Sequence, residues 1–153
     1  MNPSTIAKTL TIAAVTAFAL GIAPRAKADD RGCSEATLKG VFAYTSTGFI
    51  VAAAPYGGPY AEVGTQTFDG KGSVTFTFNA SQNGAVGLGT ATGTYTVNDD
   101  CTGTFMETSD GFTAHFSFVI DKSGDELQAI CQDTSAVVTR FARRQFPRDD
   151  WRR

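Results

Sequence analysis

From residue 37 onward, apolar and polar residues alternate with a period of two, and short turn sequences interrupt the alternation at intervals. The clearest run covers residues 112–120, in which every second residue is apolar. Successive side chains of a β-strand point to opposite faces, so this pattern describes strands with one buried and one exposed face. No run in this part of the sequence has the period of an amphipathic helix. The chain is therefore predicted to be all-β.

Turn sequences rich in Asn, Asp and Gly separate the alternating runs, because these residues accept the backbone conformations of tight hairpins. They delimit eight predicted strands, at about residues 37–52, 60–69, 72–80, 86–97, 101–108, 112–121, 126–132 and 136–145. Eight antiparallel strands joined by short turns predict an up-and-down meander that closes into a small β-barrel. A two-sheet β-sandwich is the alternative. Glycines within the strands favour the barrel, since closure requires strong bends.

The first 28 residues have the form of a secretory signal peptide. Lys8 ends a short polar start, residues 10–23 form an uncharged apolar run, and Ala26-Lys27-Ala28 closes it. A membrane-spanning helix needs about 20 apolar residues, so this run is too short to remain as an anchor. We expect cleavage after Ala28 and export to the periplasm or the medium. The predicted organisation is a signal peptide (1–28), an N-terminal segment (29–36), a barrel domain (37–145) and a basic C-terminal tail (146–153).

Export changes the charge of the chain. Cleavage removes Lys8, Arg25 and Lys27 from the 13 basic residues, which leaves 10 basic against 15 acidic residues. An acidic body argues against a nucleic-acid partner, which would require a basic face. Residues 140–153 carry six Arg and two Asp. We interpret this basic segment as a solvated C-terminus.

Three cysteines, Cys33, Cys101 and Cys131, remain after export to a compartment that permits disulfides. In a meander, odd-numbered strands all start at the same end of the barrel. Cys33 precedes the first predicted strand and Cys101 opens the fifth, whereas Cys131 closes the seventh at the opposite end. We therefore predict a disulfide between Cys33 and Cys101, and a small buried apolar role for Cys131. The sequence has no CxxC or HxxxH spacing, so no metal site is expected.

His115 is the only imidazole of the chain. It lies on the strand face opposite the neighbouring phenylalanines and is predicted to point away from the core. One interpretation is a general base or a proton relay with Glu107 on the adjacent strand. We prefer the interpretation of a surface histidine, so no catalytic residue is assigned.

Candidate ligand-binding residues are Tyr44 and Glu62 on adjacent strands and Tyr56 and Tyr60 in or beside the first connection. Small-molecule sites are commonly built from a few polar groups in an otherwise apolar cavity. The connection Pro55–Tyr60 is predicted to be either a lid over the barrel or a rigid loop. The chain contains no Gly-x-Ser-x-Gly, phosphate-binding loop or dinucleotide fingerprint, and we expect no cofactor.

Four segments resemble a family of small secreted bacterial β-proteins that has no established activity. They are residues 38–44 (LKGVFAY), 67–72 (TFDGKG), 93–104 (GTYTVNDDCTGT) and 115–120 (HFSFVI). The resemblance implies one Cys before the first strand and another in the DCTGT segment. The layout is also similar to calycin and allene-oxide-cyclase-like barrels, a similarity of fold that carries no function by itself. The Gly-x-Trp of lipocalins and the aromatic box of avidins are absent from this sequence.

Three functions are open at this point. We expect a non-enzymatic exported barrel that binds a small, mainly apolar ligand or a partner in the cell envelope. The first alternative is a cofactor-free isomerase or cyclase that uses His115, Glu107, Tyr44 or Glu62 inside the barrel. The second alternative is a purely structural secreted protein whose barrel is filled by its own phenylalanines.

Overall fold

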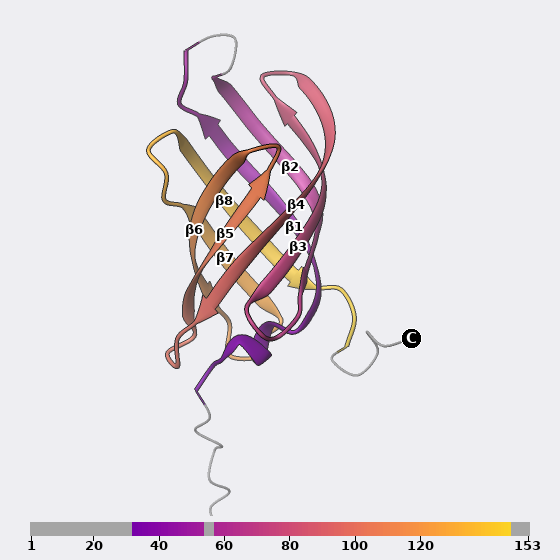
Figure 1. Ribbon diagram of the computed structural model, residues 1–153, viewed down its shortest axis with the longest axis vertical. Helices are drawn as coiled ribbons and strands as arrows, with labels where there is room; N and C mark the ends of the chain where they lie inside the picture. The colour runs from indigo at the N-terminus through magenta and orange to yellow at the C-terminus, as the bar shows by residue number, and fades with distance from the viewer. Residues whose placement is uncertain (1–31, 54–56, 148–153) are drawn as a thin grey trace, which may run out of the picture. The chain divides into compact units, whose positions relative to one another are not determined.

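The computed structural model describes residues 32–53 and 57–147, which form a closed barrel of eight antiparallel strands (Figure 1). Each strand pairs with the next along the chain, and β8 pairs with β1 to complete the ring. The predicted eight-stranded up-and-down barrel is confirmed, and a two-sheet sandwich is not formed. The strands are β1 (Gly40–Ile50), β2 (Gly58–Phe68), β3 (Ser73–Gln82), β4 (Ala85–Val97), β5 (Thr102–Ser109), β6 (Phe112–Ile120), β7 (Glu126–Cys131) and β8 (Ala136–Arg144).

The strand bounds agree with the predicted ranges to within three residues. Several predictions fall outside the described residues: the signal peptide (1–28), the first residues of the N-terminal segment, Tyr56, and residues 148–153 of the basic tail. Arg140 and Arg144, which we interpreted as part of a solvated basic segment, lie instead within β8. The alternation of β8 explains this correction, because both positions are in phase with the buried Val138 and Ala142.

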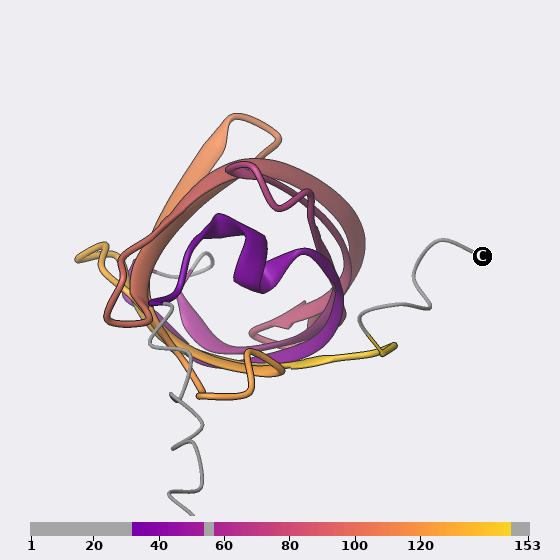
Figure 2. The ribbon, with the colours of Figure 1, turned by 90° about the horizontal axis from the view of Figure 1, so that it is seen from below.

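The two ends of the barrel differ, and we name them by what lies there. The open end carries the connections that follow β1, β3, β5 and β7. The closed end carries the connections that follow β2, β4 and β6, together with a 3-10 helix, η1 (Glu35–Leu38). Seen from below, η1 lies within the ring of strands (Figure 2).

Helix η1 replaces the start of the first predicted strand at residue 37. The reason is local, because Ser34 and Thr37 bond to each other across the turn. The Thr37 hydroxyl accepts the Ser34 N–H at 3.1 Å, and the Ser34 carbonyl accepts the Thr37 N–H at 2.9 Å. This turn directs Leu38, which is fully buried, into the end of the barrel. The Tyr95 hydroxyl donates to the Glu35 carbonyl at 3.0 Å and fixes η1 to β4.

The predicted disulfide between Cys33 and Cys101 is confirmed. It joins the segment before η1 to the β4–β5 connection, and the Cys33 N–H also donates to the Asp99 carbonyl at 3.0 Å. The bridge closes a loop of 68 residues, which in the chain-entropy model stabilises the fold by about 4 kcal/mol. The closed end is therefore held both covalently and by hydrogen bonds.

Aromatic side chains fill the interior from η1 to the middle of the barrel. Phe42 packs edge-on against Phe68 at a centroid distance of 5.5 Å, and Phe68 packs against Tyr95 at 4.8 Å. Further toward the middle, Phe105 stacks on Phe116 at 4.7 Å. These contacts leave the half of the barrel nearer the open end as the place where a cavity can form.

Glycine allows close strand contact at particular positions. A Cβ atom at Gly93 would lie 1.9 Å from the carbonyl oxygen of Met106 on β5, so only glycine permits this approach. A Cβ atom at Gly87 on the same strand would meet no atom within 4 Å. The close approach of β5 therefore requires glycine at position 93, whereas no neighbouring atom requires it at position 87.

Candidate functional site

The interior near the open end contains a cavity of about 480 Å³. Its wall is mainly apolar, because the inward positions of the surrounding strands carry aliphatic and aromatic residues, among them Ile50, Phe78, Ala91, Phe116 and Val138. Three charged side chains line it, which are Glu62, Glu107 and Arg140. Its volume lies within the range of about 300–1,000 Å³ that is typical of small-molecule sites.

Arg140 on β8 is the centre of the polar group at the floor of this cavity. Its side chain is 1% exposed, and its guanidinium bonds to three other strands. Nε donates to the Ser46 hydroxyl at 2.8 Å, Nη1 donates to Glu107 at 2.8 Å, and Nη2 donates to Glu62 at 3.1 Å and Glu107 at 3.2 Å. A buried cation is tolerated where its donors are satisfied by charged and polar acceptors, as they are here.

Aromatic rings surround the guanidinium. Its central carbon lies 4.2 Å from the centroid of Tyr44 and 4.9 Å from that of Phe116. Phe76 and Phe105 lie at 5.4 Å each. Cation–π attraction therefore adds to the hydrogen bonds that hold Arg140 in the interior.

Glu62 on β2 is the most enclosed carboxylate of the group, with its side chain 3% exposed. It accepts hydrogen bonds from the Tyr44 hydroxyl at 2.5 Å, from the Tyr60 hydroxyl and from Arg140. Glu107 on β5 is different, because its side chain is 17% exposed and both of its hydrogen bonds come from Arg140. Glu107 is thus the carboxylate that a molecule in the cavity can reach.

The environment fixes the protonation of the neighbouring groups. Burial raises the pKa of Tyr44 and of Tyr60 far above the ordinary value, and hydrogen bonding to Glu62 adds to the effect. Burial by itself would lower the pKa of Arg140, but the carboxylates beside it prevail and raise it. At neutral pH both tyrosines therefore act as hydrogen-bond donors, and Arg140 is charged.

The structure brings together four of the residues named from the sequence: Tyr44, Glu62, Tyr60 and Glu107. Tyr56 lies outside the described residues, so the two interpretations of the first connection stay untested.

His115 is not part of this group. Its partner in the β5–β6 register is Met106, whereas Glu107 pairs with Ala114, so His115 and Glu107 point to opposite faces. The predicted outward orientation of His115 is confirmed, and the relay with Glu107 is not formed. The His115 side chain is 55% exposed, and its Nδ1 lies 2.9 Å from Oδ1 of Asp133.

Cys131 is half-buried and lines the rim of the cavity. Its Sγ lies 3.7 Å from Oδ2 of Asp133, and burial raises the pKa of the thiol. A raised pKa lowers the thiolate fraction, which agrees with an unreactive role. Within residues 32–53 and 57–147, no three His, Cys, Asp or Glu side chains group in a way that could hold a metal ion.

Sequence reasoning missed Arg140 and Ser46. The signal for Arg140 was present, since Val138, Arg140 and Ala142 alternate with polar or exposed residues on one strand. An arginine in phase with apolar inward positions indicates a buried cation that requires carboxylate partners. Ser46 likewise continues the inward series of Phe42 and Tyr44 on β1.

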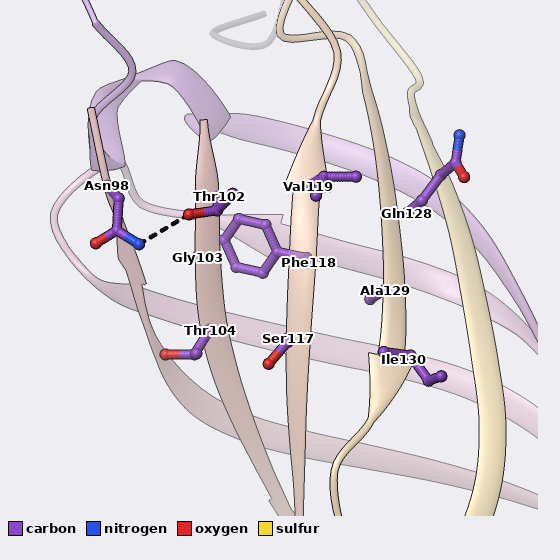
Figure 3. A pocket seen from close by; sticks show the side chains of 10 residues that line it. All are labelled: Asn98, Thr102, Gly103, Thr104, Ser117, Phe118, Val119, Gln128, Ala129 and Ile130. Atoms are coloured by element: carbon purple, nitrogen blue, oxygen red, sulfur yellow. Dashed lines mark hydrogen bonds between the residues drawn. The ribbon is translucent and has the colours of Figure 1, made fainter. Parts of the chain in front are cut away.

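A second hollow, of about 560 Å³, lies across β5, β6 and β7 and involves outward-facing residues such as Thr104 and Ile130 (Figure 3). Phe118 reaches it beside Gly103, and Asn98 Nδ2 donates to the Thr102 hydroxyl at 2.9 Å. Its lining residues carry no charged side chain. The larger hollow therefore lacks the ionic group that distinguishes the cavity at the open end.

The fold and the cavity together define a small β-barrel with an internal cavity and a buried ionic cluster, which consists of Arg140, Glu62 and Glu107. Searches of protein-family models, curated proteins and solved structures found no match. Among the described residues, no helix is both long and apolar enough to cross a membrane. The geometry of the cavity is therefore the basis on which a function is inferred.

Proposed function

We propose that this protein is an exported binding protein whose barrel takes up a small, mainly apolar molecule through its open end. The observation that carries the proposal is the cavity of about 480 Å³, which has apolar walls and one polar group at its floor. Binding sites for small molecules combine these two features, because apolar walls supply affinity and a few polar groups fix orientation.

The size of the wall residues supports this function over a purely structural one. Ala80, Ala91 and Ala114 stand at inward positions around the cavity, where larger side chains would fill it. Phe42, Phe68 and Phe118 fill the closed half instead, whereas Phe78 and Phe116 line the cavity without filling it. A barrel stabilised only by its own packing would gain from filling both halves.

Two features support export. The sequence begins with a predicted signal peptide, and the Cys33–Cys101 disulfide fits an oxidising compartment such as the periplasm or the medium. Within such a compartment the ligand reaches the barrel either free or from a partner in the cell envelope.

The test fills the cavity without changing the outer wall. Ala80→Trp places an indole inside the cavity. Ala61→Trp places the same group on the exposed face of β2, where Ala61 pairs with Ser81, the residue after Ala80. The probe is N-phenyl-1-naphthylamine, an uncharged dye whose fluorescence rises in apolar sites. We expect saturable binding by the wild type and by Ala61→Trp, and at least about tenfold weaker binding by Ala80→Trp. Thermal unfolding verifies that both variants are folded. Equal binding by all three proteins, or none by the wild type, would contradict the proposal.

A second candidate function, a cofactor-free isomerase, is favoured by one observation: Glu107 is a carboxylate that faces an apolar cavity. Such a group can move a proton within an unsaturated ketone. The probe reaction is the conversion of cyclohex-3-enone to the conjugated cyclohex-2-enone, followed by ultraviolet absorbance. An isomerase predicts faster conversion by the wild type than by Glu107→Gln, and equal rates would reject it.

A further inference from the structure

The charge of the buried cluster is unbalanced. Among the described residues that line the cavity, Arg140 contributes one positive charge, and Glu62 and Glu107 contribute two negative charges when ionised. The sum is −1 on side chains that are only 1% (Arg140), 3% (Glu62) and 17% (Glu107) exposed. A net buried charge is costly, so the cluster gains from one further positive charge.

The free acceptor capacity of the cluster belongs to Glu107. A carboxylate has about four lone-pair sites. Glu62 uses three of them for Tyr44, Tyr60 and Arg140, while Glu107 uses two for Arg140. Glu107 is also the more exposed of the two, at 17% against 3%. A donor that enters the cavity therefore finds an available acceptor at Glu107.

Arg140 offers little to an anion. Four of its five N–H donors are engaged, by Ser46, Glu62 and Glu107, and its side chain is 1% exposed. A carboxylate that reached the floor would lie beside two like charges. The cluster thus disfavours fatty-acid-like ligands, even though it contains an arginine.

The charged residues at the open end agree with this preference. Within residues 32–53 and 57–147, every Lys and Arg other than Arg140 lies at the closed end, which carries Lys39, Lys71, Lys122, Arg143 and Arg144. The connections at the open end carry Asp110 and Asp133, and Asp133 contacts His115. An open end that carries acidic but no basic side chains attracts cations and repels anions.

We propose that the ligand is an organic cation, a protonated amine on an apolar body, whose ammonium group bonds to Glu107 at the floor of the cavity. Phe78, Phe112 and Phe116 line the path, and aromatic faces attract such cations. This inference rests on the proposed function and names the class of ligand for the same site.

The test compares three competitors of equal chain length that differ in head group: octylamine, 1-octanol and octanoate. Each displaces N-phenyl-1-naphthylamine from the wild-type protein at pH 7. We expect octylamine to displace the dye at a concentration about tenfold lower than octanol, and octanoate to be the weakest. If the dye binds in the cavity and octylamine is no better than octanol, the cation proposal fails while the proposed function stands. If the dye does not bind, both fail.

Glu107→Gln assigns the preference to one carboxylate. The amide keeps the shape of the side chain and removes its charge. The ratio of the displacing concentrations of octanol and octylamine should therefore fall from about ten to about one, and octanoate should displace the dye at a lower concentration than it does from the wild type. Glu126→Gln, on the closed end, is the matched control and should keep the wild-type order. A preference that survives in folded Glu107→Gln overturns the assignment. If that variant does not fold, the comparison of head groups on the wild type still decides the ligand class.

Discussion

Arg140 on β8 and Glu107 on β5 are joined across the barrel interior by two hydrogen bonds, Nη1 to Oε2 at 2.8 Å and Nη2 to Oε1 at 3.2 Å. These strands are not neighbours in the ring. Through Ser46 and Glu62, the same guanidinium also reaches β1 and β2. One side chain therefore connects four strands and sets the depth at which the cavity ends.

Replacing Arg140 should destabilise the fold strongly. Arg140→Leu leaves Glu62 and Glu107 buried without their cation, and loss of one partner of a buried ion pair costs about 3–5 kcal/mol. Urea unfolding followed by circular dichroism measures this loss. Arg143→Leu is the control on the same strand, since Arg143 pairs with Glu126 at 3.6 Å on the surface. The control should change stability by less than about 1 kcal/mol. Equal effects would show that the buried cluster is not a stabilising connection.

Alanine should destabilise the fold at Gly93 of β4 but not at Gly87 of the same strand. At Gly93 the new Cβ would lie 1.9 Å from the Met106 carbonyl oxygen, so Gly93→Ala should cost about 1–3 kcal/mol or more. A Cβ added at Gly87 would meet no atom within 4 Å, so Gly87→Ala should be neutral or raise the free energy of unfolding by about 0.4–1 kcal/mol. Denaturation midpoints of the two variants test the pair. A neutral Gly93→Ala would mean that β4 and β5 can separate without loss.

Gln66 should be replaceable with a gain. Its side chain is fully buried, and neither amide atom has a hydrogen-bond partner among the described residues. An unsatisfied buried polar group costs about 1–3 kcal/mol, so Gln66→Met should raise the free energy of unfolding by about 1–2 kcal/mol. Gln128→Met, at an exposed position of β7, should change it by less than about 0.5 kcal/mol. A destabilised Gln66→Met would indicate that the amide contributes to the native state.

Asp121 should make stability depend on acid pH. Burial tends to raise the pKa of Asp121, but hydrogen bonds from the Ser123 side chain and from backbone N–H groups lower it from 3.8 to about 2. Because the pKa of Asp121 is lower in the folded than in the unfolded state, the ionised carboxylate stabilises the fold, and this contribution is complete above the unfolded-state pKa. It is lost as the pH falls from about 4 to about 2.

Asp121→Asn should therefore lower the melting temperature at pH 7 and flatten its fall between pH 4 and 2. The control is Asp110→Asn at the β5–β6 turn, where Asn tolerates the φ of 48°. The control should retain the wild-type pH profile. An unchanged profile in Asp121→Asn would reject the assignment.

Much of the fold was predictable because it follows from a period of two. The alternation located all eight strands, and the parity of a meander paired Cys33 with Cys101. Helix η1 was missed because four residues are too few to show a helical period, although the Ser34–Thr37 spacing is a capping signature. Local hydrogen bonding, rather than hydrophobic pattern, decided that segment.

The site was predictable only in part. Tyr44, Glu62, Tyr60 and Glu107 were named from the sequence, but what joins them is Arg140. The sequence interpretation counted Arg140 with the basic residues of segment 140–153, although its position in the alternation of β8 indicates that its side chain points inward. Which strands face each other across a barrel depends on closure, and closure is not visible in any local pattern.

Helix η1 and the aromatic core occupy the closed end, so the cavity of the described barrel lies toward the connections after β1, β3, β5 and β7. Under the proposed function, a ligand that bonds to Glu107 through its head group would leave tail first, along the path by which it entered. Any membrane or protein that exchanges cargo with the barrel must meet the rim formed by the connections after β1, β3, β5 and β7. Partner binding and ligand entry would then compete for the same face, so a partner bound at this rim would block ligand exchange until it dissociates.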